Sequence, residues 1–401
     1  MSKSLASGRA HLAIPGPSVM PDRVLRAMHC AAPNIYEGDL LDLTATIYED
    51  LNVLAGNSGD AIIYIGNGHA AWEASLVNTL SRGDRILALV TGRFGQGWVS
   101  MAEALGIDVQ ILDFGMSQSA SPDDVASALQ ADTDHQIKAV ITVQTDTATS
   151  ITNDIASIRR AMNRADHPAL LMVDCIASFA CEPFHMNEWG VDVMMTASQK
   201  GLMTPPGLAV MFIRETVWPY YEKADLKTPY WDWLPRVKPS YFAAHFCGTP
   251  PTHHLYGLRE ALDILLEEGM ENVWYRHQVQ ASAVWAAVEA WGVEGDLQLN
   301  VPLKSDRSLA VTSVKTREGL APRLREWCEQ EAGLTLGIGF NLVNSGEPTT
   351  SVFRIGHMGH LNPHSLLGTL GSIEAGLSAL DIKGAGRGVE AAIQVMASNK
   401  V

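Results

Sequence analysis

Cysteine is scarce in this chain of 401 residues, and its five cysteines are scattered along the sequence. They show neither the paired spacing of a zinc site nor the density of a small disulfide-stapled secreted domain. We therefore expect reduced thiols and a cytoplasmic location. The five are Cys30, Cys175, Cys181, Cys247 and Cys328.

Positive charge and long apolar runs are also in short supply. Lysine and arginine number 29 against 44 acidic residues, a formal net charge of −15, so no nucleic-acid partner is expected. There is no basic cluster for an anionic membrane, and no apolar run approaches the ~20 residues that span a bilayer. The N-terminus MSKSLASGRAHLAIPGPSVM lacks the apolar core of a signal peptide. We expect a soluble protein without membrane partners.

What the chain does have is a regular series of short apolar runs, separated in the earlier part by helical stretches. Apolar residues make up 47% of the sequence and charged residues 18%, as in a globular protein. Continuous apolar strands separated by helices predict an α/β fold with a mostly parallel sheet covered on both faces. The runs are Ala61–Ile65, Arg85–Val90, Val109–Phe114, Ile137–Val143, Ala169–Asp174, Val191–Met195 and Leu208–Ile213.

The C-terminal part follows a different order of elements. After two long helical stretches it continues as strand, helix, strand, strand, helix, which predicts a small α+β domain. We divide the chain into an N-terminal arm (1–20), a large domain (21–270) and a small C-terminal domain (271–401). Residues 218–246 are aromatic and proline-rich without a clear period. Such a long stretch should pack against the body of the protein or against a second subunit.

A glycine-rich turn follows the first apolar run. In GNGHAAWEA, Gly66 and Gly68 allow close backbone approach, and the helix that begins there presents free N–H groups that suit a phosphate. The segment partly matches the dinucleotide-binding fingerprint, but no acidic residue ends the next run. Taken alone, it is equally typical of a plain tight turn.

Two charged residues stand at the ends of later runs. Asp174 ends ALLMVD, and Lys200 follows VDVMMTASQ just before a glycine and a proline-rich break. Alone, the aspartate could cap the following turn and the lysine could be solvated. Together with the glycine-rich turn, they favour pyridoxal phosphate, which needs a lysine amine, an acid for its pyridine nitrogen and a phosphate site.

At these residues the chain resembles the class V aminotransferases of fold-type I, in particular the serine/alanine–glyoxylate aminotransferases. The resemblance covers nearly the whole chain, and its blocks occur in the family order. It implies a large domain with a mostly parallel seven-stranded sheet flanked by helices, and a small α+β domain. The blocks are PGPSVMPDRVLRAM, GNGHAAWEASLVNTLSRGD, VDCIASFACEPFHMNEWGVDVMMTASQKGLMTPPGLAV, GTPPTHHLYGLREAL and FRIGHMGHLN.

The resemblance also implies which residues bind pyridoxal 5'-phosphate. Lys200 would form the Schiff base and move the proton during catalysis, and Asp174 would pair with the pyridine nitrogen. The other contacts would be Asn67, Gly68, His69 and Gln199 around the phosphate, Thr147 near the phenolic oxygen or imine, Ile176 beneath the ring and Phe94 stacked on it, where many relatives have tryptophan.

Two further residues complete the implied site. Thr249 of the partner subunit would contact the phosphate, which implies a homodimer with shared active sites. Arg354, in FRIGHMG, would bind the substrate carboxylate through a bidentate fork. A surface arginine is the poorer interpretation, because the flanks of Arg354 are apolar and glycine-rich.

Three features depart from the family pattern. Phe246 stands where many relatives have tyrosine, Ser150 replaces a common glycine, and residues 32–43 (APNIYEGDLLDL) differ in a region near the substrate. The cofactor is therefore predicted more firmly than the amino donor.

Other chemical candidates are weaker. His357, His360 and His364 lie close in sequence, but Pro363 interrupts the spacing and no cysteine or acid completes a set, so no metal site is expected. Cys328 lies in a helical pattern and is interpreted as a packed thiol.

The predicted function is ping-pong transamination between serine, alanine or aspartate and glyoxylate or pyruvate. One alternative is a pyridoxamine–pyruvate aminotransferase, whose family shares RIGHMG and much of the scaffold. A lower-ranked alternative is a cofactor-sensing scaffold without enzyme activity, against which the intact Asp174 and Lys200 pair argues.

Overall fold

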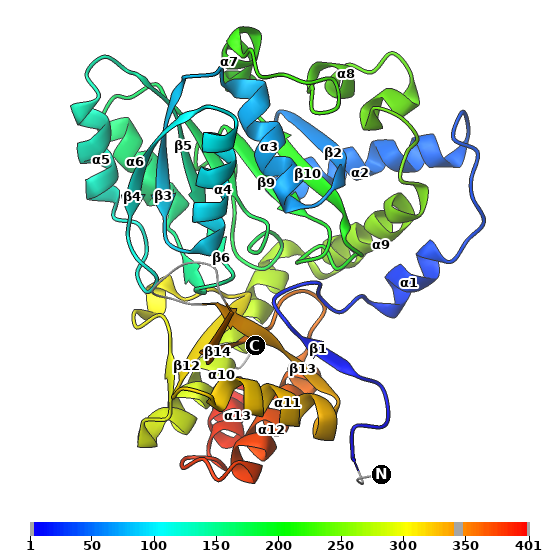
Figure 1. Cartoon of the computed structure of the whole chain (residues 1–401). Helices are drawn as coiled ribbons and strands as arrows, with labels where there is room; N and C mark the ends of the chain where they lie inside the picture. The colour runs from blue at the N-terminus through cyan, green and yellow to red at the C-terminus, as the bar shows by residue number, and fades with distance from the viewer. Residues whose placement is uncertain (1–3, 341–347, 399–401) are drawn as a thin grey trace.

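The chain folds around two β-sheets in the computed structural model, which describes residues 4–340 and 348–398 (Figure 1). One sheet has seven strands and the other five, and a short hairpin, β6 (Thr145–Asp146) and β7 (Ile151–Thr152), forms a third, two-stranded sheet. Figure 1 shows the seven-stranded sheet with its helices in the upper part and the five-stranded sheet in the lower part. Within the described residues, no helix combines the length and apolar character needed to cross a membrane.

The seven-stranded sheet is parallel except at one strand. Its order is β2-β10-β9-β8-β5-β3-β4, and β10 runs antiparallel to both of its neighbours. All seven predicted apolar runs form its strands, so the mostly parallel sheet is confirmed. The strands are β2 (Asp60–Gly66), β3 (Arg85–Val90), β4 (Asp108–Asp113), β5 (Ile137–Val143), β8 (Leu170–Asp174), β9 (Val193–Ala197) and β10 (Gly207–Ile213).

Helices cover both faces of this sheet because its strands are apolar on both sides. Along β2, Ile63 packs into a core with α2, α5, α6 and α9, whereas Ile62 and Tyr64 pack into a second core with α3, α4 and α7. The Ser121 side chain caps α5 by accepting a hydrogen bond from Asp124 N. The helices are α2 (Asp39–Ala55), α3 (Gly68–Thr79), α4 (Arg93–Ala104), α5 (Pro122–Ala131), α6 (Ile155–Arg164), α7 (Trp218–Lys223) and α9 (Thr252–Glu268).

The five-stranded sheet takes one strand from the N-terminus. Its order is β1-β13-β14-β12-β11, and β1 runs parallel to β13 although more than 300 residues separate them. Four helices, α10 to α13, share one apolar core with this sheet. The elements are β1 (His11–Ala13), α10 (Met270–Trp291), β11 (Leu297–Leu299), β12 (Val311–Thr316), α11 (Leu320–Ala332), β13 (Leu334–Phe340), β14 (Pro348–Gly356), α12 (Pro363–Ala379) and α13 (Gly388–Ser398).

The aromatic stretch 218–246 packs largely on the body of its own chain. Trp233 is fully buried in the core that contains α3, and Tyr64 Oη donates a hydrogen bond to the carbonyl of Trp231. The stretch forms α7, a short helix α8 (Leu234–Val237) and a final 3-10 turn. Tyr241 is 65% exposed, so part of the stretch is left at the surface.

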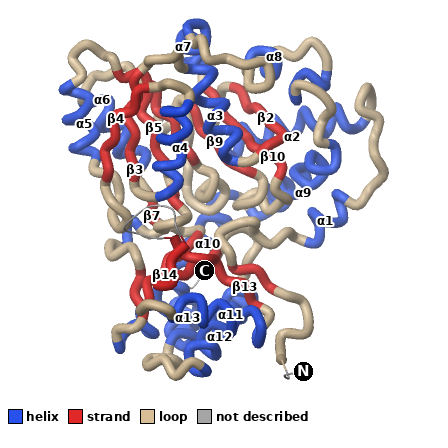
Figure 2. The backbone as a smooth tube through the Cα atoms, viewed as in Figure 1, coloured by secondary structure: helices blue, strands red, loops and turns tan. Residues whose placement is uncertain are grey.

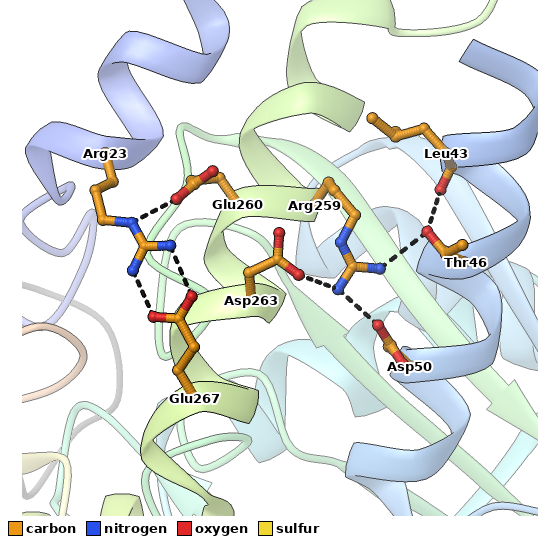
Figure 3. A network of polar contacts seen from close by, with 8 residues as sticks. All are labelled: Arg23, Leu43, Thr46, Asp50, Arg259, Glu260, Asp263 and Glu267. Carbon is orange, nitrogen blue, oxygen red and sulfur yellow. Dashed lines mark hydrogen bonds and ion pairs between the residues drawn. The ribbon is translucent and has the colours of Figure 1, made fainter. Parts of the chain in front are cut away.

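Ion pairs attach the first two helices to α9. Arg23 of α1 (Asp22–Met28) makes hydrogen bonds to Glu260 and, through two nitrogens, to Glu267 (Figure 3). Arg259, 13% exposed, lies close to Asp50 of α2 and Asp263, with nitrogen–oxygen distances of 2.6 and 2.9 Å. Residues 14–21 connect β1 to α1 and pass Lys200. The ion pairs of α1 therefore hold the C-terminal end of this connection in place.

Most of the predicted site residues come together because parallel strands end on one edge. Strands β2, β3, β5, β8 and β9 run in the same direction, so the loops after them share one side of the sheet. In Figure 2 these loops lie between the strands of the two sheets.

Candidate active site

A cavity of about 230 Å³ lies at this strand edge. Nine of the predicted cofactor-binding residues line it: Asn67, Gly68, His69, Phe94, Thr147, Asp174, Ile176, Gln199 and Lys200. Four lining residues were not found from the sequence, namely Trp72, Val143, Thr145 and Ala177. Residues from five strand ends therefore converge on one volume.

Asp174 is the buried acid of the cavity, with 2% of its surface exposed. Its Oδ1 accepts a hydrogen bond from Ile176 N at 2.6 Å, and its Oδ2 accepts one from Trp72 Nε1 at 2.8 Å. Burial raises the pKa of Asp174 to about 7, although both hydrogen bonds and Lys200 oppose the rise. A carboxylate in this state gains from a positively charged partner such as a protonated ring nitrogen.

Trp72 could have been found from helix periodicity. It follows Gly68 by four residues in α3, so both residues lie on the same helix face. Its indole is 1% exposed and stacks on Trp98 with ring centroids 6.0 Å apart. This packing holds the N–H that reaches Asp174.

Lys200 follows β9 and reaches back to the N-terminal segment. Its Nζ donates a hydrogen bond to the carbonyl of Pro15, and its own carbonyl accepts one from Ser18 Oγ at 2.7 Å. Gly16 has φ +92°, and a Cβ there would lie 2.5 Å from Lys200 Nζ. Burial, and then the charge of Arg354, lowers the pKa of Lys200 to about 8. The amine is therefore easier to deprotonate than an ordinary lysine.

The N-terminus of α3 forms another wall. Asn67 caps the helix by accepting a hydrogen bond from His69 N at 3.1 Å. A Cβ on Gly68 would lie 2.2 Å from Cδ1 of Ile176, so a larger residue here would displace the Ile176 side chain. The free N–H groups of this helix end suit an anion such as a phosphate.

Phe94 is held in place by a buried carboxylate. At the start of α4, Phe94 N donates to Asp146 Oδ2 at 2.7 Å, and Gly95 N donates to the same atom at 3.3 Å. Burial raises the pKa of Asp146. The Phe94 ring lies against Trp72 in an edge-on arrangement with centroids 6.4 Å apart. Phe94 is thus placed to stack on a ring bound in the cavity.

Arg354 lies directly behind the cavity wall. It is 8% exposed in β14, its Nη1 donates to the carbonyl of Thr147 at 2.8 Å, and its Nε donates to the carbonyl of Ile338 at 2.6 Å. Burial lowers the pKa of Arg354 to about 10, partly offset by the charge of Asp146. Its guanidinium also lies 4.7 Å from the ring centre of Phe340. Among the described residues, Nη2 has no hydrogen-bond partner.

Thr249 is exposed and is not among the residues that line the cavity of its own chain. Its predicted role concerns a second subunit, so it stays a prediction.

Ser150 has φ +61°, a left-handed conformation that glycine adopts without strain. That conformation gives a physical reason for glycine in relatives.

The three clustered histidines do not form a metal site. His357 is fully buried, where Nδ1 and Nε2 make hydrogen bonds to the carbonyl of Leu309 and to Thr312 Oγ1. In the described part of the chain, no group of three or more histidine, cysteine or acidic residues is arranged to hold a metal ion. Cys328 is buried in α11, as a packed thiol would be.

The donor set fits pyridoxal phosphate. The cavity offers a helix N-terminus for the phosphate, two apolar residues for the ring, a buried acid and an amine. Gln199 lines the cavity as well, and its side-chain NH₂ is the group that can donate to a phosphate. Each chemical part of the cofactor therefore has a counterpart.

Comparison with known proteins agrees with this arrangement. The sequence model of the family described as Aminotransferase class-V matches residues 47–353. The chain is 38% identical to a serine–glyoxylate aminotransferase of Methylorubrum extorquens, covering 100% of this chain and 99% of the relative. It is 32% identical to an L-aspartate–glyoxylate aminotransferase of Paracoccus denitrificans, covering 92% and 91%.

Solved structures show the same fold. The structure of pyridoxamine–pyruvate aminotransferase from Mesorhizobium loti superposes with a TM-score of 0.89 at 25% identity and covers 100% of both chains. A ureidoglycine–glyoxylate aminotransferase from Bacillus subtilis superposes with a TM-score of 0.86 at 26% identity, covering 98% and 100%. The chain thus belongs to the class V aminotransferases and is an aminotransferase of fold-type I.

Proposed function

We propose that this aminotransferase uses pyridoxal 5'-phosphate to move an amino group from serine, alanine or aspartate to glyoxylate or pyruvate. The observation that carries the proposal is the meeting of Lys200 and Asp174 in one cavity, with Arg354 behind its wall. The relatives named for serine–glyoxylate and aspartate–glyoxylate transfer support this substrate class.

The residues of the cavity would hold the cofactor by its chemical parts. When bound, pyridoxal phosphate forms a carbon–nitrogen double bond with an amine and draws electrons away from the substrate α-carbon. Asp174 would keep the ring nitrogen protonated, and Asn67, Gly68 and His69 at the start of α3, together with Gln199, would surround the phosphate. Ile176 and Phe94 would hold the ring, and Thr147 would lie beside it.

Lys200 and Arg354 would act on the substrate. The lowered pKa of Lys200 leaves a useful fraction of its Nζ neutral near pH 7, so this atom can take a proton from the substrate α-carbon and return it. Arg354 would bind the substrate carboxylate, because a guanidinium pairs with a carboxylate through two parallel N–H groups. Glyoxylate and a small amino acid each carry the carboxylate that this site needs.

A second candidate is transfer from pyridoxamine to pyruvate. It is favoured by the superposition on the Mesorhizobium loti enzyme along the full length of both chains. A non-catalytic cofactor sensor ranks below both, because Lys200 and Asp174 are both present in the cavity. We retain the cytoplasmic location and the division at residues 20 and 270 as proposals.

A donor panel tests the function. We expect purified protein to turn over serine, alanine or aspartate with glyoxylate or pyruvate, followed through the absorbance of the bound cofactor and through product formation. Pyridoxamine with pyruvate is run in parallel at the same concentrations. Faster turnover of pyridoxamine than of every amino acid would replace the first proposal by the second.

The reactivity of Lys200 should depend on pH. Only the neutral amine reacts, and a pKa of about 8, lowered from 10.5, means that the neutral fraction rises up to about pH 8 and then levels off. We expect the rate of cofactor capture by apoprotein to follow that curve in stopped-flow absorbance. Borohydride reduction and peptide mapping should then find the cofactor on Lys200, and Lys200→Ala should stay folded but inactive. A capture rate that still rises tenfold per pH unit between pH 8 and 10 would contradict the lowered pKa.

Loss of Arg354 should weaken use of carboxylate substrates. A charge-assisted hydrogen bond is worth roughly 1.5–3 kcal/mol, so Arg354→Ala should lower kcat/KM for glyoxylate by about 10- to 150-fold. Arg354→Lys should recover only part, because a point charge cannot supply two parallel donors. An amine without a carboxylate serves as the control substrate. Unchanged glyoxylate turnover would rule out the carboxylate role.

We also propose a homodimer in which Thr249 of the partner subunit completes each phosphate site. Lys200→Ala and Thr249→Glu should each be inactive as homodimers. Mixed after unfolding and refolding, they should regain about a quarter of wild-type activity, because half of the dimers are mixed and each has one intact site. Light scattering that shows an active monomer, or a mixture without activity, would exclude shared sites.

A further inference from the structure

A buried carboxylate outside the cavity has no part in the reaction just described. Glu182 lies in the connection between β8 and β9 and is 3% exposed. Its Oε1 accepts hydrogen bonds from Thr145 Oγ1 at 2.9 Å, Ser308 Oγ at 2.8 Å and Leu309 N at 3.0 Å. Its Oε2 accepts one from Thr152 Oγ1 at 2.9 Å. Burying this group is costly, and four donors offset the cost.

These donors come from two places far apart in the sequence. Thr145 and Thr152 belong to the hairpin β6–β7 at the edge of the cavity, and Thr145 itself lines the cavity. Ser308 and Leu309 lie just before β12 in the five-stranded sheet. Glu182 therefore joins three segments, from the large sheet, the hairpin and the small sheet.

The tip of the same hairpin reaches Arg354. Between β6 and β7, the carbonyl of Thr147 accepts the hydrogen bond from Arg354 Nη1. Two residues further, the carbonyl of Thr149 accepts from Asn300 Nδ2 at 2.8 Å, and Ser150 Oγ accepts from Ser313 N at 3.1 Å. The base of the hairpin is thus held by Glu182 and its tip by residues of the small sheet.

The backbone of Arg354 depends on β12 in turn. In the antiparallel pair β12–β14, Ser313 is the direct partner of Arg354. At the start of β12, Ser308 Oγ accepts hydrogen bonds from Ala310 N and Val311 N while it donates to Glu182. One carboxylate therefore fixes both the hairpin that carries Thr147 and the strand that carries the partner of Arg354.

We propose that Glu182 is a positioning residue that sets the placement of the Arg354 guanidinium against the cavity wall and so controls binding of the substrate carboxylate. The inference rests on the proposed function, in which Arg354 receives that carboxylate. Glu182 touches neither substrate nor cofactor in this assignment, and it acts through Thr145, Ser308 and the two strands.

The hydrogen-bonding protons around Glu182 indicate which substitution would best preserve its contacts. Thr145 and Thr152 hydroxyl oxygens lie 2.7 Å apart and each lies 2.9 Å from a carboxylate oxygen, which makes three contacts for two hydroxyl protons. If Oε2 carried a proton, it would donate to Thr152 Oγ1 instead of accepting from it, and Thr152 would donate to Thr145. Burial raises the pKa of Glu182 in the direction that favours this form. A glutamine amide can reproduce this pattern, with its oxygen facing Ser308 and its NH₂ facing Thr152. Leucine removes every acceptor at similar size.

A buried carboxylate of purely structural role is available as a matched control. Asp192, 5% exposed at the other end of the same connection, accepts hydrogen bonds from Arg159 Nη2, Leu171 N and Thr216 Oγ1. All of these partners lie around the seven-stranded sheet, away from the hairpin and from β12. Asp192→Asn should lower the melting temperature without changing the kinetic constants.

The experiment compares Glu182→Leu, Glu182→Gln and Asp192→Asn as cofactor-loaded proteins. For Glu182→Leu we expect unchanged cofactor content and absorbance, KM for glyoxylate raised about 10- to 100-fold, and kcat changed much less. Glu182→Gln should restore most of the affinity. Should Glu182→Leu fail to fold, Thr152→Val, which removes one donor and keeps the volume, should raise the same KM by a smaller factor.

The outcomes separate this inference from the function on which it rests. A raised KM in Arg354→Ala together with an unchanged KM in Glu182→Leu and Thr152→Val would overturn the positioning role alone. If Arg354→Ala leaves the KM for glyoxylate unchanged, Arg354 does not bind the substrate carboxylate, and the proposed function itself is wrong on this point. Glu182→Leu and Asp192→Asn could also lower the melting temperature equally and leave both KM values unchanged. Glu182 would then only stabilise the fold.

Discussion

The desolvated carboxylate of Asp174 is the group around which the active site is organised. Because it is 2% exposed, it is largely removed from water and depends on donors from the protein. One donor, Trp72, fixes α3, whose N-terminus forms the anion-binding wall. The other, Ile176 N, fixes the side chain that packs against Gly68. The acid, the ring-binding residue and the phosphate wall are therefore held by one pair of hydrogen bonds.

Burial is the main cause of the pKa shifts of the ionisable groups around the cavity, and the attraction between Asp174 and Lys200 opposes the shift of each. Burial raises the pKa of Asp174 and lowers those of Lys200 and Arg354, so each neutral form becomes more accessible. The charge of Arg354 adds to the shift on Lys200, whereas Asp146 partly restores that of Arg354. Proton transfer on an amino acid needs a neutral amine as the base, here Lys200, and a cation that holds the carboxylate, here Arg354. These shifts arise from packing, because the groups come from different strands.

Residues at the junction of the two sheets contribute to the active site as well as residues of the large sheet. Lys200 is covered by Pro15 and Gly16, which follow a strand of the small sheet, and Arg354 comes from that sheet directly. The hairpin β6–β7 and its turn line the same cavity as Lys200 through Thr145 and Thr147, and the carbonyl of Thr147 accepts a hydrogen bond from Arg354. A change in how the sheets meet would alter the substrate side of the cavity, while Asp174, Trp72 and α3 remain on the large sheet.

The sequence by itself determined the mostly parallel sheet, because continuous apolar runs between helices leave few other arrangements. It also determined that an acid and an amine stand at strand ends, because Asp174 ends one apolar run and Lys200 follows another. Through the resemblance it also indicated nine residues that line the cavity. Tertiary structure alone decided that Trp72 binds Asp174, that β1 joins β13, and that Glu182 collects donors from Thr145 and Ser308. These contacts join residues 37 to more than 300 positions apart, and local patterns cannot encode them because they depend on how the sheets pack and on which buried polar atoms then need partners.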